Sequence, residues 1–443
     1  MRVLLVSTYE LGRQPFGLAS PAAWLAARGH RVACLDLSIG SPSADTVRDA
    51  DLIAFYLPMH TATRLAVVAM EKFRPLNPAA HVCCYGLYAA LNESYLRKLG
   101  VQAIFGGEFE AALVSLAERL EGCCEPGPQV EPLISLERLQ FLPPLRSLLP
   151  SLDHYAELRI NGTRKRSGYT EASRGCKHLC RHCPVVPVYR GTFRVVQAEV
   201  VLADIRNQVA AGAEHITFGD PDFFNGPSHA IRIVEALHRE FPELTYDATI
   251  KIEHLLKHRD LLPRLKATGC LFVTSAVESI DDAILEKLDK GHTRAGFIEV
   301  VRDFRAVGLT LAPTFIPFTP WTTRQSHREL LELLLELDLV EHVAPIQLAL
   351  RLLIPQGSLL LELRDVQRVV AGYDEAALLY RWKHPDPEVD MLAERALKLA
   401  ALEGSRRDIF RKMWALAADE PLPDEFDLMP RATIPYMDEP WYC

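Results

Sequence analysis

The chain has 443 residues, which is too long for one hydrophobic core. Of these residues 49% are hydrophobic and 24% are charged, a composition typical of a folded globular protein. A net charge of -8 leaves no excess of Lys and Arg for a phosphate backbone. This excludes nucleic acid as the expected partner and favours a small-molecule or peptide substrate. The apolar run at residues 3–6 is too short for a signal peptide or a membrane span, so we expect a cytoplasmic protein without a membrane partner.

The N-terminal part of the chain alternates short β-branched runs with helical patterns, for example at residues 21–28 and 66–73. This alternation predicts a doubly wound parallel sheet of the flavodoxin or Rossmann type over residues 1–122. Ligands of such sheets bind at the carboxyl ends of the strands. The predicted strands are residues 2–8, 31–36, 51–57, 81–85 and 101–105.

The rest of the chain divides into three predicted segments. Residues 123–168 are Pro-rich and lack sustained periodicity, which indicates an ordered linker. A second alternation over residues 169–361 predicts a partial (β/α)6 barrel of the TIM type, and residues 362–443 are expected to form a helical extension and tail. The fold class is therefore α/β. The predicted barrel strands lie near residues 169–173, 215–218, 245–250, 271–276, 311–316 and 346–353.

Three cysteines follow the first predicted barrel strand. Cys176, Cys180 and Cys183 are spaced x3 and x2, and thiolates with this spacing can hold a 4Fe-4S cluster while one iron keeps no protein ligand. The open iron suits a chelating substrate. The alternative is a zinc-stabilised binding protein in which His178 or His182 supplies a fourth ligand. Structural zinc sites usually pair two separated knuckles, however, and only one is present here.

The motif Cys-x3-Cys-x2-Cys at the end of a first barrel strand resembles the radical S-adenosylmethionine (SAM) superfamily. The resemblance implies that the amino and carboxylate groups of SAM chelate the open iron. It also implies that electron transfer from a donor such as flavodoxin or ferredoxin cleaves SAM to a radical fragment. The cofactors would then carry the chemistry and the protein would position them.

Other barrel-strand ends extend this resemblance over residues 169–355. The run Gly-Asp-Pro-Asp-Phe-Phe at residues 219–224 resembles the segment that receives the amino group of SAM, although a simple acidic turn is the alternative. Residues 273–279 and 285–292 resemble the ribose and carboxylate contacts. Residues 317–320, Pro-Phe-Thr-Pro, replace a glycine-rich turn of many relatives and leave the adenine contact open. The implied SAM-binding residues are Gly219, Asp220, Asp222, Ser275 and Glu278.

The N-terminal domain lacks the Gly-x-Gly-x-x-Gly fingerprint after its first strand, so nicotinamide binding is not expected. A flavodoxin-like domain before such a barrel is similar to the cobalamin-binding class of the superfamily. The Asp-x-His-x-x-Gly signature is absent, so a bound cobalamin would lack a lower histidine ligand. A vestigial module or docking surface is the alternative. The candidate cobalamin-binding residues in the strand-end loops are Thr8, His60, Arg64, Gly86, Gly106 and Gly107, with His60 or Arg64 facing the vacant side of the corrin.

The expected activity is reductive cleavage of SAM coupled to transfer of a methyl or other group with cobalamin, and the chain is expected to be an enzyme. The alternative is a cobalamin-independent transfer of the aminocarboxypropyl part of SAM to a soft acceptor such as arsenite, a reaction that resembles that of known arsenic-handling enzymes.

The end of the chain, Trp441-Tyr442-Cys443, resembles radical SAM proteins whose tails read Cys-Sec-Ala-Glu-Pro or Cys-Cys-Ala-Glu-Pro. We expect Cys443 to be the first half of such a pair, with an in-frame UGA after its codon. A vicinal pair of this kind would bind thiophilic metals or metalloids, or be redox-active.

Overall fold

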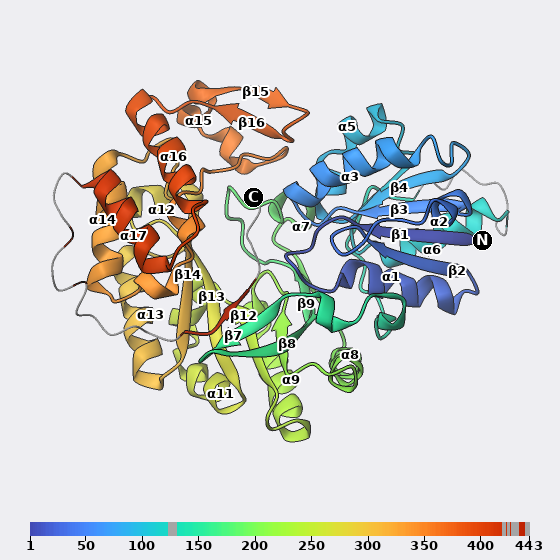
Figure 1. The fold of residues 1–443 in the computed structure, drawn as a ribbon, viewed down its shortest axis with the longest axis horizontal. Coiled ribbons are helices and arrows are strands. Elements are labelled where there is room, and N and C mark those ends of the chain that lie inside the picture. The colour runs from blue at the N-terminus through green and yellow to red at the C-terminus, as the bar shows by residue number, and fades with distance from the viewer. Residues whose placement is uncertain (123–130, 419–421, 423–425, 427–433, 439–443) are drawn as a thin grey trace.

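The computed structural model describes residues 1–122, 131–418, 422, 426 and 434–438. An N-terminal α/β domain lies beside a curved second sheet, and the last helices pack on the outside of that second sheet (Figure 1). In these described ranges, no helix has both the length and the apolar character needed to cross a membrane. The expectations for Cys443 fall outside the described residues.

The N-terminal domain is a parallel sheet in the order β2-β1-β3-β4-β5-β6, which is the flavodoxin-like arrangement. Successive side chains of β1 point to opposite faces, so Leu4 joins one core cluster with α3 and Val3 joins another with α1 and α6. Helices on both faces explain why these strands are nearly continuous apolar runs. The elements are β1 (Arg2–Ser7), α1 (Phe16–Ala27), β2 (Arg31–Asp36), α2 (Ala44–Arg48), β3 (Leu52–Tyr56), α3 (His60–Phe73), β4 (His81–Tyr85), α4 (Leu87–Leu91), α5 (Glu93–Lys98), β5 (Ala103–Gly107), α6 (Glu110–Leu120) and β6 (Ile134–Ser135).

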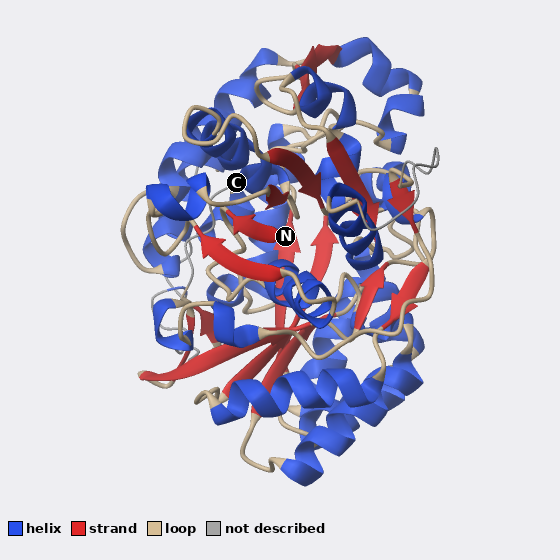
Figure 2. Cartoon of the chain, turned by 90° about the vertical axis from the view of Figure 1, so that its right-hand side faces the viewer, coloured by secondary structure: helices blue, strands red, loops and turns tan. Residues whose placement is uncertain are grey.

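The second sheet has the order β14-β13-β12-β11-β8-β7-β17, and its five strands from β8 to β14 are parallel. Helices cover the outer side of this curved sheet (Figure 2). The elements are β7 (Glu157–Ile160), β8 (Thr163–Thr170), β9 (Ser173–Gly175), α7 (Val186–Tyr189), β10 (Phe193–Val195), α8 (Ala198–Ala210), β11 (His215–Phe218), α9 (Pro227–Glu240), β12 (Thr245–Thr249), α10 (Ile252–Lys257), α11 (Leu262–Ala267), β13 (Cys270–Glu278), α12 (Asp282–Leu288), α13 (Arg294–Val307), β14 (Thr310–Phe315) and α14 (Arg324–Glu336).

The C-terminal region is mainly helical, as predicted, but it also contains an antiparallel hairpin. Helices α16 and α17 pack together, and α17 packs on α14 of the barrel. Strand β17 returns to the barrel, where Asp438 forms an ion pair with Arg159 on β7 at 2.7 Å. The elements are α15 (Arg364–Val369), β15 (Val370–Asp374), β16 (Leu379–Trp382), α16 (Pro387–Ala400), α17 (Arg406–Ala417) and β17 (Tyr436–Met437).

The predicted α/β class, with a flavodoxin-like sheet before a partial barrel, is confirmed. The segment predicted as the sixth barrel strand differs from the other five, because it begins as a 3-10 turn and pairs with the barrel through one parallel bridge between Phe318 and Arg351. The predicted linker contains the β7–β8 hairpin, which turns at Asn161 and Gly162. The exact limits of the four predicted segments stay predictions.

Candidate functional site

The three cysteines of the loop lie at the carboxyl end of β8, next to the N-terminal domain. Cys180 is buried, Cys176 and Cys183 are half-buried, and all three are free thiols. Burial raises the pKa of the Cys176 thiol and raises that of Cys183 to about 12, and in each case the charges of other loop thiols contribute. Ionisation of one of these thiols would therefore disfavour ionisation of the others. A metal centre would have to displace their protons.

The loop is held at both of its ends. At its start, the Asn225 side chain accepts a hydrogen bond from the Lys177 backbone N–H at 3.2 Å and donates to the Gly175 carbonyl at 3.2 Å. At its end, α7 packs into the core of the N-terminal domain through Val188 and Tyr189. The loop therefore bridges the two sheets, and α7 lies between them (Figure 1).

The spacing of the three sulfur atoms bears on which metal centre fits them. Tetrahedral zinc with Zn–S bonds of about 2.3 Å brings its sulfur ligands to within about 4 Å of one another. Within the described part of the chain, the group of three donor atoms that all lie within 4.8 Å of one another contains no cysteine. The three loop sulfur atoms therefore do not all lie within 4.8 Å of one another, as three ligands of one tetrahedral zinc ion would.

Glu278 connects the cysteine loop to the fourth parallel barrel strand. Its carboxylate lies 3.2 Å from His182 Nε2 and 3.4 Å from Lys290 Nζ. Burial alone would raise the pKa of Glu278, but Lys290 and then His182 lower it to about 2. The residue has a positive φ of 68°, at a register shift between β13 and β14. The predicted site residue Glu278 is thus a buried anion beside the cysteine loop.

Lys290 places a buried positive charge beside the cysteines, and sequence reasoning did not single it out. Burial lowers its pKa, but Glu278 and the charges of Cys180 and Cys183 outweigh that effect and raise it. A cation in this place would stabilise thiolates of a bound cluster. The segment at residues 285–292 contains Lys290, but only the fold shows that it faces the loop.

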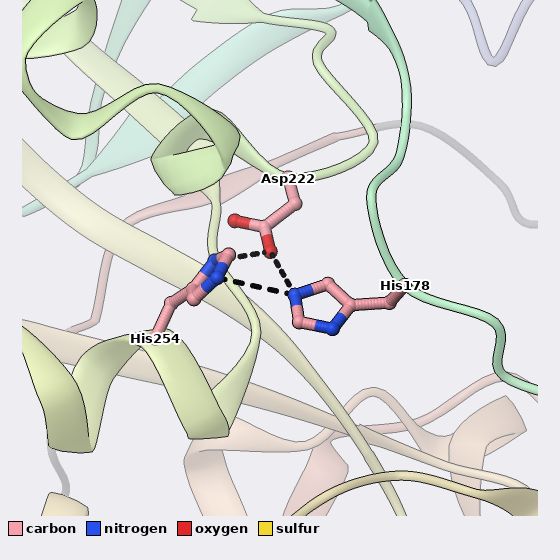
Figure 3. Close-up of side chains that lie close together, drawn as sticks. All are labelled: His178, Asp222 and His254. Carbon is pink, nitrogen blue, oxygen red and sulfur yellow. Dashed lines mark hydrogen bonds and ion pairs between the residues drawn. The ribbon is translucent and has the colours of Figure 1, made fainter. Parts of the chain in front are cut away.

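The other predicted SAM-binding residues serve the framework in different ways. Asp220 is buried and accepts hydrogen bonds from Ser173 Oγ at 2.5 Å and from the Ala172 backbone N–H at 2.9 Å. Ser275 Oγ donates to the Ile250 carbonyl at 2.6 Å. A Cβ at Gly219 would lie 1.9 Å from the Tyr169 hydroxyl, so only glycine fits there. Asp222 points instead toward two histidines (Figure 3).

Several buried polar atoms near the cysteines have no hydrogen-bond partner. Both ring nitrogens of His292 are unpartnered, and so is Nδ1 of His182. Burial lowers the pKa of His292 to about 4, so its ring is neutral at neutral pH. Buried polar groups without partners are costly, and they often mark where a ligand binds. His182 Nδ1 is therefore open to a polar partner beside the cysteine loop.

Two cavities contain residues from the carboxyl edge of the N-terminal sheet. The first, of about 180 Å³, is lined by Met59, Gly86 and Gly107 and by Tyr189 of α7. The second, of about 470 Å³, is mainly apolar, and His60 and Arg64 of α3 meet His182 of the cysteine loop in its lining. Most of its other lining residues come from the segment 346–355 and from the C-terminal region.

The predicted cobalamin-binding residues lie partly in a helix and partly at the strand ends. His60 and Arg64 lie in the first turns of α3 rather than in a loop, and His60 Nε2 lies 2.6 Å from the Ala377 carbonyl. Thr8 is tied to α3 because its hydroxyl donates to the Ala62 carbonyl at 2.7 Å. The positive φ of Gly86 suits a helix start. Gly106 and Gly107 give close approach to β6, since a Cβ at Gly107 would lie 2.1 Å from the Ser135 carbonyl oxygen.

A buried charge network joins the cysteine loop to the N-terminal domain. The Arg174 guanidinium, two residues before Cys176, is 6% exposed and lies 2.7 Å from Glu110, 2.8 Å from Glu171 and 3.3 Å from Glu108. Glu108 also accepts a hydrogen bond from the Tyr189 hydroxyl at 3.1 Å. The network could not be predicted from the sequence, because its members are up to 81 residues apart.

Glu108 makes the stability of the chain depend on pH. Burial raises its pKa to about 7, and the charge of Glu110 adds to this although Arg174 opposes it. A Glu in an unfolded chain titrates near pH ~4.3. Between that pH and about 7 the folded chain therefore binds more protons than the unfolded chain. The stabilisation that comes from protonated Glu108 is lost as the pH rises through about 7. We expect the free energy of unfolding of Glu108→Gln to rise, relative to that of the original chain, by up to about 3 kcal/mol as the pH increases from ~4 to ~8.

The measurement is the free energy of unfolding of both proteins at a series of pH values. The control is Glu243→Gln, which replaces an exposed carboxylate outside the network. A difference for Glu108→Gln that does not change with pH would contradict the assignment of a raised pKa to Glu108.

Residues 170–334 match the family model described as the Radical SAM superfamily. This part of the chain is a radical SAM domain. Members of that family use a 4Fe-4S cluster and SAM, and the matched segment contains the cysteine loop and the strands β11 to β14. The expectation of an enzyme of the radical SAM type is confirmed at the level of this domain.

Curated relatives carry the resemblance beyond the domain. The chain is 25% identical over 335 residues to the hopanoid C-3 methylase of Methylococcus capsulatus, which covers 72% of this chain and 64% of the relative. It is 29% identical over 187 residues to the tRNA-2-methylthio-N(6)-dimethylallyladenosine synthase of Desulfosudis oleivorans, which covers 40% and 38%. The chain thus spans less than two thirds of either relative. The expectation that nucleic acid is not a partner stays a prediction.

Solved structures share the fold over most of the chain. The cobalamin-dependent SAM radical enzyme OxsB, solved with aqua-cobalamin and SAM bound, has a TM-score of 0.70 at 14% identity, covering 89% of this chain and 66% of OxsB. The radical SAM methyltransferase TsrM from Kitasatospora setae, solved with cobalamin and a [4Fe-4S] cluster, has a TM-score of 0.60 at 18% identity, covering 76% and 73%. At these identities the likeness establishes the shared fold.

Proposed function

We propose that the chain is a cobalamin-dependent radical SAM enzyme that transfers a methyl or other group to a small-molecule substrate. The observation that carries the proposal is the position of the cysteine loop. Cys176, Cys180 and Cys183 lie between the end of the first parallel barrel strand and the carboxyl edge of a flavodoxin-like sheet. In such sheets that edge is where ligands bind.

The cluster ligands are Cys176, Cys180 and Cys183, and the bound cluster would supply the electron that cleaves SAM. Lys290 stabilises the thiolate charge from its buried position, and Glu278 holds both Lys290 and His182 in place. Gly219 keeps the end of β11 free of a side chain, and Asp220 fixes the backbone on which the loop begins. The electron comes from an external donor such as flavodoxin or ferredoxin.

The cavity at the strand ends is the candidate site for the corrin. It has a volume of about 180 Å³ and is lined by Met59, Gly86 and Gly107 from this edge and by Tyr189 of α7. The second cavity, of about 470 Å³, includes His60 of the same edge and His182 of the cysteine loop. The similarity to the methylase of Methylococcus capsulatus favours a methyl group as the transferred group.

Binding of hydroxocobalamin to the whole chain tests this proposal. We expect a change in its visible spectrum and retention of one cobalt per chain after desalting. Met59→Trp fills the first cavity and should weaken this binding by at least about tenfold, since a side chain that occupies the site removes contact area. Leu65→Trp is the matched control on the exposed side of α3 and should bind as the original chain does.

Two results would contradict the cobalamin part. One is the absence of both the spectral change and retained cobalt, which would leave the N-terminal domain as scaffold and favour the cobalamin-independent transfer to a soft acceptor. The other is equal weakening by Met59→Trp and Leu65→Trp, which would show that binding is not at the strand ends.

A further inference from the structure

Three side chains from separate elements converge beside the cysteine loop. They are His178 of the loop, Asp222 after β11 and His254 of α10 (Figure 3). Asp222 Oδ2 lies 2.7 Å from His254 Nδ1 and 3.8 Å from His178 Nε2, and His178 Nε2 lies 3.1 Å from His254 Nε2. One donor atom from each residue can be chosen so that all lie within 4.8 Å of one another.

Two of the three side chains are buried: those of Asp222 and His254 are 3% and 2% exposed, whereas that of His178 is half-buried. Asp222 Oδ2 and His254 Nδ1 form an ion pair at 2.7 Å, but neither atom makes a hydrogen bond in the described part of the chain. A cation between the carboxylate and the two imidazoles would satisfy all three groups.

The surroundings hold these side chains in the orientation that metal ligands need. Asp222 Oδ1 accepts a hydrogen bond from the Phe224 backbone N–H at 3.0 Å, which turns Oδ2 toward the histidines. His178 Nδ1 lies 3.4 Å from Glu253, and Glu253 accepts from Lys251 Nζ at 2.9 Å. Ligating histidines commonly place their second nitrogen against a carboxylate, and ligating carboxylates are hydrogen-bonded in turn.

We propose that His178, Asp222 and His254 bind one divalent transition-metal ion, separate from the cluster on the three cysteines. Two imidazoles and one carboxylate suit Zn²⁺ or Fe²⁺, and three protein ligands leave at least one coordination position open. The ion ties the middle of the cysteine loop to the segments that follow β11 and β12, and so fixes the position of the cluster ligands on the barrel. Asp222 then serves this ion rather than the amino group of SAM.

The site is tested without the cluster. In the full chain with Cys176, Cys180 and Cys183 replaced by Ala, Co²⁺ is added as the probe after treatment with a chelator. We expect one equivalent to bind with visible d–d absorption and to be displaced by Zn²⁺. His254→Ala should weaken binding by more than about 100-fold, beyond the effect of losing an outer partner. His258→Ala, whose ring centre lies 6.1 Å from that of His254, should bind Co²⁺ normally.

A second measurement uses the cluster-loaded chain and does not depend on the folding of the triple variant. Elemental analysis should give one metal ion beyond the cluster iron, either zinc or an additional iron, and His254→Ala should remove this ion and keep the cluster iron. An unchanged metal content in His254→Ala, or equal loss of Co²⁺ in His258→Ala, would overturn the proposal. Failure of SAM cleavage or of cobalamin binding would bear on the proposed function alone.

Discussion

Cys180→Ala is expected to reduce the iron bound by the anaerobically reconstituted chain from about four per cluster to near zero. Cys180 is buried in the middle of the loop, and the Ala side chain offers no ligand atom, so the cluster would keep only two of its three protein ligands. The brown colour and the reductive cleavage of SAM should be lost together. Iron analysis, the visible spectrum and product analysis check the three effects.

The matched control is Cys270→Ala, at a buried free cysteine on β13 outside the loop. This variant should keep its cluster iron and its SAM cleavage. If Cys180→Ala kept both at the level of the original chain, the loop would not be the cluster site. If Cys270→Ala lost both, the loss would reflect a general effect of removing buried thiols.

Arg174→Met is expected to lower the free energy of unfolding by about 3–5 kcal/mol, since it leaves buried carboxylates without their cation. The guanidinium faces Glu108, Glu110 and Glu171, and it lies 4.8 Å from the ring centre of Phe141. The network spans the N-terminal domain and the cysteine loop, so unfolding should begin with separation of the two. Chemical denaturation followed by circular dichroism provides the measurement.

A double variant separates charge from packing. Adding Glu110→Leu to Arg174→Met removes one unpaired buried charge and should restore part of the loss. Arg28→Met breaks an exposed pair with Glu118 at 3.1 Å and should cost no more than about 1 kcal/mol. A loss for Arg174→Met as small as that for Arg28→Met would show that the network adds little to the stability of the chain.

The sequence predicts those parts of the fold whose cause is local. The strands of the N-terminal sheet are apolar runs because helices cover both faces, and such runs can be recognised without the fold. The cysteine loop can be recognised for a similar reason, since Cys176, Cys180 and Cys183 lie within eight residues. Their spacing indicates the chemistry before any contact is known.

The β7–β8 hairpin shows why other parts were not predicted. Its strand residues Arg164, Lys165 and Arg166 are charged and pair with β7 in the part of β8 that precedes its pairing with β11, where apolar periodicity is absent. The Asn161-Gly162 pair is a strong hairpin signal that could have indicated it. At residues 346–353 the apolar pattern predicted a strand that is not formed in full. Its side chains line a cavity, and the segment pairs with the barrel through one bridge only.

Most of the site chemistry could not be predicted because it depends on contacts between distant segments. Lys290 faces the cysteines across more than one hundred residues of sequence, and His254 meets His178 across 76. The spacing of charged residues gives no indication of such pairs. Only the winding of the barrel, which brings the carboxyl ends of its strands to one edge, places these groups together.

The central claim is that the chain cleaves SAM with a cluster held by the cysteine loop. Its most direct test is to incubate the reconstituted chain with SAM and a strong reductant without oxygen, and to follow SAM and its fragments by liquid chromatography and mass spectrometry. We expect a stable product of the SAM-derived radical, such as 5'-deoxyadenosine, to form only when cluster and reductant are both present. A colourless chain that contains zinc in place of cluster iron, and that leaves SAM intact, would contradict the account.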